Sequence, residues 1–246
     1  MAELASGEGA ERSMGGQVGS SAAARERRTF TGLRPERVAE NLERVRERLA
    51  AAGGDPTRVE VCAAIKYVPA AELPALAEAG IELVGESRAQ DLVAKHAEHA
   101  NLFTWDFVGA VQSRKVRDLA GRVRLIHSVA SHSTLRRLER HPVGEVLLEV
   151  NVAGEEGKAG VAPGQLDELL AASPVPVTGL MTMPPAVTDP EESRPHFARL
   201  AELAAGRGLA RLSMGTTQDF EVAVSEGATI VRLGSRLYEG AAVGSY

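Results

Sequence analysis

The chain has 246 residues, of which 44% are hydrophobic and 25% charged, and its net charge is −5. These proportions are those of an ordinary globular protein and exclude a wholly disordered chain or a fibrous repeat. No apolar run approaches the roughly 20 residues of a membrane-spanning helix, and no long basic block indicates nucleic-acid binding. We therefore expect neither a membrane nor a nucleic acid as a partner. The single cysteine, Cys62, excludes an internal disulfide.

Residues 1–30 form a segment rich in Gly, Ala and Ser with almost no large apolar side chains. Such a segment cannot offset its ordering entropy, so we predict a disordered tail and one folded domain over residues 31–246. The tail has no apolar stretch behind a basic start and carries acidic residues early, which argues against a secretory or transit signal. We expect a cytoplasmic protein, for which Met14 is an alternative start to Met1.

A periodic body follows the tail. Residues 35–51 place apolar side chains at helical spacing behind a Pro, which predicts an amphipathic helix. Eight short apolar runs then alternate with helical stretches, at residues 59–66, 81–85, 104–109, 123–129, 145–152, 175–182, 209–215 and 229–234. Their nearly continuous apolar character is typical of parallel strands covered by helices. Eight such units, recurring about every 24 residues, predict a single α/β (β/α)8 TIM barrel with an extra N-terminal helix; a doubly wound open sheet is the alternative.

In such a barrel the carboxyl ends of the strands form the active face. Lys66 ends the first run, after the apolar Val61–Ile65 segment, and it is one of only four lysines among 28 basic residues. An amine that emerges from an apolar strand is suited to forming a Schiff base, because desolvation favours its neutral form. The alternative is a strand-end lysine that reaches into solvent or pairs with Glu86. If the strand continues through Tyr67, that side chain should point away from Lys66.

Two glycine-bearing loops follow the last two runs. Residues 213–217 read Ser-Met-Gly-Thr-Thr, and residues 232–235 read Arg-Leu-Gly-Ser. Glycines let backbone N–H groups approach an anion, and barrels often bind phosphate between the loops after strands 7 and 8. Either loop alone is more simply an ordinary turn. Together with Lys66 they favour a ligand that carries both a carbonyl and a phosphate group, such as pyridoxal 5′-phosphate (PLP).

Other polar residues carry weaker signals. His127 sits inside an apolar run, where a hydrogen-bonded core histidine is favoured over an acid/base role. Asn151 ends a run and either caps its turn or lines a site. Lys158 belongs to a glycine-rich loop that is either solvated or closes over a ligand, and Cys62 is expected to pack inside the barrel. No HExxH, CxxC, GxSxG or Walker pattern occurs, so the corresponding metal, redox, esterase and P-loop functions have no support.

From about residue 35 to 240 the chain resembles the pyridoxal phosphate homeostasis protein family, relatives of the N-terminal barrel of alanine racemase. The resemblance rests on ordered matches that include AAIKYVP, GESRAQDLV, IHSV, LEVNVAGEEGKAG, GLMTMPP and LSMGTTQDFEVAVSEGATIVRLGS. It implies a PLP barrel of fold type III, with the cofactor bound to Lys66. The implied phosphate contacts are Ser213, Met214, Gly234 and Ser235; Arg232 would lie near the pyridine nitrogen, and Asn151 and Met181 would line the pocket.

The resemblance implies a PLP-binding protein of intracellular cofactor homeostasis, acting as a carrier or buffer with little or no catalysis. An arginine beside the pyridine nitrogen weakens the ring as an electron sink, and racemases of this fold add a second acid/base from a C-terminal domain. Because only 12 residues follow Gly234, we expect no such domain here. PLP and apo PLP-dependent enzymes are the expected partners of a monomer. An amino-acid racemase is the enzymatic alternative, and an aldolase-type lyase is a third.

Overall fold

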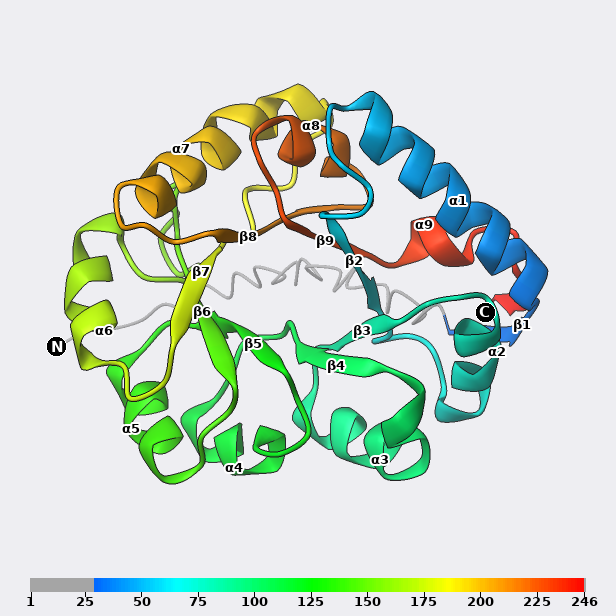
Figure 1. The fold of residues 1–246 in the computed structure, drawn as a ribbon, viewed down its shortest axis with the longest axis horizontal. Coiled ribbons are helices and arrows are strands. Elements are labelled where there is room, and N and C mark those ends of the chain that lie inside the picture. The colour runs from blue at the N-terminus through cyan, green and yellow to red at the C-terminus, as the bar shows by residue number, and fades with distance from the viewer. Residues whose placement is uncertain (1–28, 246) are drawn as a thin grey trace, which may run out of the picture.

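The computed structural model describes residues 29–245. Eight parallel strands close into a barrel in chain order, and the helices surround it as an outer ring (Figure 1). The barrel strands are β2 (Glu60–Ala64), β3 (Leu83–Glu86), β4 (Thr104–Phe107), β5 (Leu125–Val129), β6 (Glu145–Glu149), β7 (Val177–Met181), β8 (Arg211–Thr216) and β9 (Ile230–Leu233). Because β9 pairs with β2, the sheet has no open edge. The predicted (β/α)8 barrel is confirmed, and the doubly wound alternative is wrong.

The outer ring consists of helices that follow the strands. They are α2 (Leu73–Glu78), α3 (Ala89–His99), α4 (Val116–Leu119), α5 (His132–Arg140), α6 (Leu166–Ala172), α7 (Arg194–Ala205), α8 (Phe220–Ser225) and α9 (Ser235–Tyr238). The extra helix α1 (Pro35–Ala51) precedes β2, as predicted, and buries Val38, Leu42, Val45 and Leu49. Among the described residues, no helix combines the length and apolar character needed to cross a membrane.

Two apolar layers result from the alternation of side chains along each strand. Inside the barrel, Cys62, Leu83, Leu125, Leu147, Met181 and Ile230 pack together. The intervening strand residues face outward and join the apolar faces of the helices in a larger core. Cys62 is fully buried in the inner layer, which confirms its predicted packing role, and burial raises the pKa of its thiol.

A second, two-stranded sheet was not predicted. Strand β1 (Phe30–Leu33) pairs antiparallel with β10 (Ala242–Ser245), joining segments from the two ends of the described chain. Residues 1–28 of the predicted disordered tail lie outside the described residues. Phe30, the last residue of that predicted tail, belongs instead to β1, and its ring lies 5.0 Å from that of Tyr238. Glu72 fastens this sheet to the barrel, because its two carboxylate oxygens accept the N–H groups of Gly32 and Leu33, each at 2.8 Å.

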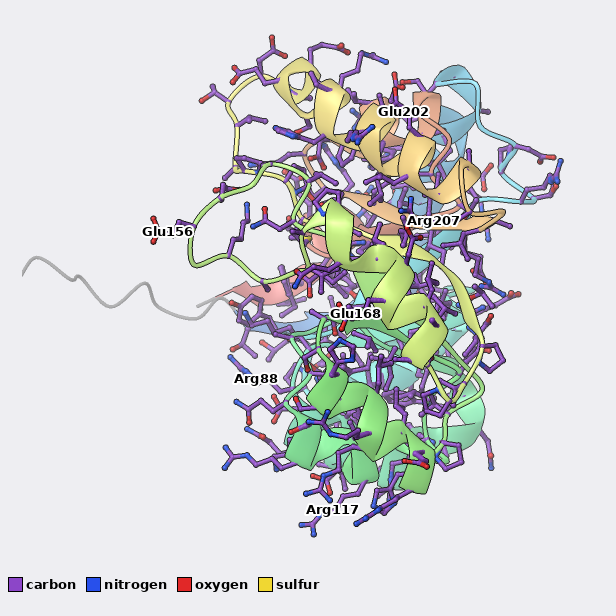
Figure 2. The ribbon with its side chains drawn as sticks, turned by 90° about the vertical axis from the view of Figure 1, so that its left-hand side faces the viewer. Arg88, Arg117, Glu156, Glu168, Glu202 and Arg207 are labelled. Atoms are coloured by element: carbon purple, nitrogen blue, oxygen red, sulfur yellow. The ribbon has the colours of Figure 1, made fainter. Side chains whose placement is uncertain are left out.

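The carboxyl ends of the strands share one side of the molecule. Arg88, shortly after β3, and Glu156, in the loop after β6, both lie on this side, at the left of Figure 2. The strands end earlier than the apolar runs suggested: β2 ends at Ala64, so Ile65 and Lys66 lie beyond it. Residues at a parallel strand's end can stay apolar and buried while the backbone already turns, and Ile65 is fully buried.

Candidate functional site

Lys66 occupies a reverse turn directly after β2. The N–H of Val68 donates to the Ile65 carbonyl at 3.0 Å, so Lys66 and Tyr67 are the two central residues of the turn. The Lys66 side chain is half-buried, and its Nζ lies 4.9 Å from the centroid of the Tyr67 ring. The condition under which Tyr67 would point away from Lys66 is therefore not met, because β2 ends before this pair.

Three elements brace this turn from different sides. Lys95, on α3, donates from Nζ to the Ile65 carbonyl at 2.7 Å. The Tyr238 hydroxyl, on α9, donates to the Ala64 carbonyl at 3.3 Å, and the Phe30 N–H, on β1, donates to the Tyr67 carbonyl at 2.9 Å. These contacts fix the backbone on both sides of Lys66 and so hold the base of its side chain in place.

Lys95 is held in turn by a buried ion pair. Its Nζ lies 2.6 Å from Glu86 Oε2, and the two side chains are only 9% and 0% exposed. Glu86 Oε1 accepts the N–H groups of Ser87 and Arg88 at 2.6 and 3.2 Å, so both carboxylate oxygens have partners other than Lys66. The alternative pairing of Lys66 with Glu86 is therefore wrong. Sequence reasoning missed Lys95, although its rarity as a lysine was a usable signal.

The loops after β8 and β9 meet at the same rim. The N–H of Gly234 donates to Thr217 Oγ1 at 3.4 Å, and a Cβ built on Gly234 would lie 3.8 Å from Ala64 Cβ, two residues before Lys66. Ser235 begins α9, and the N–H groups of Ser235 and Arg236 have no acceptor within the helix, whereas that of Leu237 donates to the Gly234 carbonyl at 2.9 Å. A cavity of about 510 Å³ opens beside these loops, and Thr217, Ser235 and Tyr238 contribute to its lining.

Two of the predicted phosphate contacts lie deeper. Ser213 is fully buried and its hydroxyl points into a polar chain inside the barrel, described below, while the Met214 side chain packs in the apolar core. Gly215, with φ of +89°, lets α8 approach closely: a Cβ there would lie 2.6 Å from that of Ala223. The structure therefore gives Gly234 and Ser235 direct access to the rim, whereas Ser213 and Met214 support the loop from below.

Arg232 is a buried guanidinium on the inner face of β9. Its Nη1 donates to Ser213 Oγ at 2.5 Å, and its Nη2 donates to the Thr182 carbonyl at 2.9 Å and lies 2.8 Å from Met183 Sδ. Among the described residues no carboxylate forms an ion pair with it, and burial lowers its pKa. A buried cation that makes no direct ion pair is costly, and Glu149 and Asp219 act on Arg232 only at longer range. This position therefore favours a ligand with an acceptor atom or negative charge.

A chain of hydrogen bonds continues from Arg232 across the barrel interior. Ser213 Oγ lies 2.8 Å from His127 Nδ1, and His127 Nε2 lies 3.1 Å from Asp106 Oδ2. Arginine only donates and an ionised aspartate only accepts, which sets the direction of the chain. Ser213 accepts from Arg232 and donates to Nδ1, so the proton of neutral His127 sits on Nε2 and is donated to Asp106.

The ionisation of this chain follows from its surroundings. Burial lowers the pKa of His127, although Asp106 opposes the effect, so the imidazole is neutral near pH 7. Burial raises the pKa of Asp106, but hydrogen bonds from His127 and Arg124 outweigh it and leave the pKa below its usual value. Arg124 donates to both Asp106 oxygens, at 3.0 and 2.7 Å. His127 is thus a satisfied core histidine, the interpretation that its apolar surroundings favoured.

The remaining predicted pocket residues have different surroundings. Asn151 lies two residues after β6, and its amide bonds to the backbone N–H and carbonyl of Glu155 at 3.2 and 2.8 Å, so it caps that loop. Met181 ends β7 and is buried in the inner layer. Lys158 pairs with Glu155 at 2.5 Å.

Sequence reasoning missed Glu149, which ends β6. It is 6% exposed, and the alternation with inward-facing Leu147 turns its carboxyl toward the barrel interior. Burial raises its pKa, while the positive charge of Arg232 lowers it by a smaller amount. No hydrogen bond to this carboxyl occurs within residues 29–245. The acidic residue inside an otherwise apolar run, LLEVNV, was the available signal.

The donors at this rim fit PLP. One half-buried primary amine, on Lys66, lies beside two loops that present the Thr217 and Ser235 hydroxyls and the first N–H groups of α9. The buried Arg232 guanidinium, which makes no direct ion pair, lies below them. An aldehyde, a phosphate and a ring nitrogen match these three donors in kind. No cluster of metal-binding side chains occurs among the described residues.

Comparison with known proteins gives consistent relatives. A pyridoxal phosphate homeostasis protein of Aquifex aeolicus is 39% identical over 219 residues, which cover 82% of this chain and 96% of the relative. A structure of PipY from Synechococcus elongatus with PLP bound is 32% identical, with a TM-score of 0.69 over 82% of this chain and 99% of that one. An unknown protein from Bifidobacterium adolescentis is 29% identical, with a TM-score of 0.75 over 83% and 95% of the two chains. No protein-family profile matches.

Proposed function

The chain belongs to the pyridoxal phosphate homeostasis protein family, and we propose that it binds PLP and holds it in the cytoplasm for delivery to apo PLP-dependent enzymes. The observation that carries the proposal is the meeting of the Lys66 turn with the Thr217 and Gly234 loops at one rim of the barrel. The protein would act as a monomer whose binding domain extends over residues 31–246.

In this proposal each rim residue has a defined task. When bound, PLP supplies an aldehyde that condenses with a primary amine and a ring that withdraws electrons. The braced Lys66 amine attaches the aldehyde, and the Gly234 and Ser235 loop, with the Thr217 hydroxyl, holds the phosphate. Arg232 donates to the ring nitrogen. Asn151, in the loop after β6, and Met181, at the end of β7, border the pocket.

Little catalysis is expected because proton donors beside Lys66 are scarce. His127 is fully buried and both its nitrogens are hydrogen-bonded, to Ser213 and Asp106. Tyr67 is 37% exposed and presents its ring, rather than a directed hydroxyl, to Lys66 Nζ. Racemisation needs an acid and a base on opposite faces of the substrate, and these contacts supply no such pair. They support a holding function.

Visible absorption tests the binding site. Full-length protein incubated with PLP should acquire an absorption band above 400 nm, and borohydride reduction should fix the cofactor on the peptide containing Lys66. Lys66→Ala should lose both signals, whereas the matched variant Lys158→Ala should retain them. A reduced adduct on Lys115 or Lys158 in the wild-type protein would refute the assignment.

Transfer tests the carrier role. Loaded protein mixed with an apo PLP-dependent enzyme should restore that enzyme's activity, while α-proton exchange of added amino acids in deuterated water stays slow. Brisk racemisation that disappears in Tyr67→Phe or His127→Gln would overturn the non-catalytic proposal and leave PLP binding intact. Absence of any bound PLP would instead remove the binding proposal itself.

A further inference from the structure

A groove with a basic lining runs between two neighbouring elements of the outer ring. One wall is the short 3₁₀ helix Ser113–Lys115 with the start of α4, and the other is α5; α4 and α5 are adjacent in Figure 1. Two cavities, of about 450 and 390 Å³, adjoin here and share Ser113 and Arg137 in their linings. The basic groove is defined by Arg114, Lys115, Arg117, Arg136, Arg137 and Arg140.

The positive charge of the groove is poorly neutralised. Within the described chain, the side chains of Arg136, Arg137 and Arg140 form no ion pair or hydrogen bond, and Arg114 donates only to Gln112, at 3.1 Å. Lys115 and Arg117 share one acidic neighbour, Asp118, at 3.4 and 3.3 Å. The whole chain nevertheless carries a net charge of −5, so the cluster is not a consequence of general basicity.

On other helices of the described chain, several exposed arginines are paired with carboxylates. Arg37 lies 2.6 Å from Glu40, and Arg199 lies 2.9 Å from Glu202, both three residues along the same helix. On α5, Glu139 lies three residues after Arg136 and lines the same cavity, but it forms no ion pair within the described residues. Arg136, Arg137 and Arg140 therefore differ from Arg37 and Arg199 in making no ion pair with a carboxylate of the described chain.

Helix electrostatics explain only part of the cluster. Basic side chains near the carboxyl end of α5 interact favourably with the helix dipole, by about 0.3–1 kcal/mol each. The cations of the opposite wall belong to another element and gain nothing from that dipole. Arg136 and Arg140 are also four residues apart, a spacing at which like charges destabilise a helix by a few tenths of a kcal/mol. The helix dipole therefore accounts for basic residues at the end of α5 but not for the basic side chains of the opposite wall.

We propose that the basic groove binds a small ligand with two or more phosphate groups, such as pyrophosphate or the phosphate chain of a nucleotide. The cavity sizes fall in the roughly 300–1,000 Å³ range of small-molecule sites. Guanidinium groups bind phosphate oxygens in a bidentate manner, and six cations exceed the charge of one monophosphate. The lining offers no apolar anchor, which disfavours a protein partner, since interfaces depend on buried aromatic and aliphatic hot spots.

Isothermal titration of full-length protein with inorganic pyrophosphate tests this site. At near-physiological salt we expect saturable binding to one site, tighter than that of orthophosphate. Arg136→Ala with Arg137→Ala should weaken it at least tenfold, and both side chains are exposed, so the variant should fold. The matched control, Arg37→Ala with Arg199→Ala, removes the same charge and should bind as the wild type does.

Each other outcome overturns the proposal. Equal losses in the two double variants would mean a general charge effect. Binding that survives Arg136→Ala with Arg137→Ala but is displaced by PLP would place pyrophosphate at the Lys66 rim. Tighter binding of duplex DNA than of pyrophosphate, lost in the same α5 variant, would identify a nucleic-acid surface instead. Because the expected result is independent of Lys66, Lys66→Ala should leave pyrophosphate affinity unchanged even if the PLP proposal fails.

Discussion

Replacing Lys95 with methionine should destabilise the protein strongly, because it removes one partner of a buried ion pair. Glu86 is fully buried, and its Oε2 lies 2.6 Å from Lys95 Nζ. Methionine fills a similar volume but leaves the Glu86 carboxylate without a counter-ion, and it also leaves the Ile65 carbonyl with one donor fewer. Breaking a buried pair from one side costs about 3–5 kcal/mol, against a total stability of about 5–15 kcal/mol.

Urea unfolding at pH 7, followed by circular dichroism, measures this loss. Lys115→Met is the matched control: Lys115 pairs with Asp118 at 3.4 Å, and their side chains are 37% and 25% exposed. Such a pair is worth about 0–1 kcal/mol. A Lys95→Met cost no larger than that of Lys115→Met would refute the reasoning that burial makes the Lys95–Glu86 pair indispensable.

A double variant separates the unpaired charge from lost packing. Glu86→Gln removes the carboxylate charge but keeps an oxygen to accept the N–H groups of Ser87 and Arg88. Lys95→Met with Glu86→Gln should therefore recover at least about 1 kcal/mol relative to Lys95→Met alone. If the double variant is the less stable of the two, the cost lies in packing and not in the stranded charge. PLP affinity should fall in both variants, because the turn carrying Lys66 loses its brace.

Gly215→Ala should lower the free energy of unfolding by at least about 2 kcal/mol, since it adds backbone strain at φ +89° and a contact of 2.6 Å with Ala223. Gly157→Ala, with φ +73° and open space around it, should lower it by roughly 1 kcal/mol. Urea unfolding measures both losses, and equal losses would contradict the packing argument. His127 has a lowered pKa in the folded state, so its share of stability is complete above its unfolded pKa of about 6.5 and is lost as the pH falls below it. The unfolding free energy of His127→Gln should accordingly depend less on pH between 7 and 5 than that of the wild type. Glu149 has a raised pKa, so its contribution is present below its unfolded pKa of about 4.3 and is lost as the pH rises. The change in unfolding free energy caused by Glu149→Gln should therefore be more favourable at pH 7 than at pH 4. The opposite order would disprove the raised pKa of Glu149.

The fold was predictable because its main signals are local. Each barrel strand is a short apolar run followed by a helical stretch, and this alternation needs no knowledge of tertiary contacts. Pairing between β1 and β10 is different: Phe30 and Ser245 meet from opposite ends of the chain, and neither short strand shows a period of its own. The end of β2 was predicted too late in the sequence for a related reason. Ile65 stays buried and apolar after β2 has ended, so composition cannot locate the turn that carries Lys66.

The candidate site was predictable where one residue type carries the signal. Lys66 and the glycines of the last two loops could be read directly from the sequence. The partners of Ser213 could not, because they depend on which side chains the closed barrel brings together: His127 comes from β5 and Arg232 from β9. Lys95 was hidden for the same reason, since its contacts with Glu86 and Ile65 join α3 to β3 and to the turn after β2.

The hydrogen-bonded interior bears on the choice between holding a cofactor and catalysing a reaction. His127 and Asp106 donate to or accept from fixed neighbours, so a proton can leave this chain only if several buried bonds rearrange together. Arg232 is held in place by the same chain and cannot act as a mobile acid. Glu149 differs, because its buried carboxyl has no hydrogen bond within the described chain and its pKa is raised, which leaves it able to exchange a proton near the rim. Any residual proton transfer to a bound amino acid should therefore depend on Glu149, Tyr67 or Lys66. If Glu149→Gln abolishes this transfer and Tyr67→Phe does not, Glu149 is the proton donor.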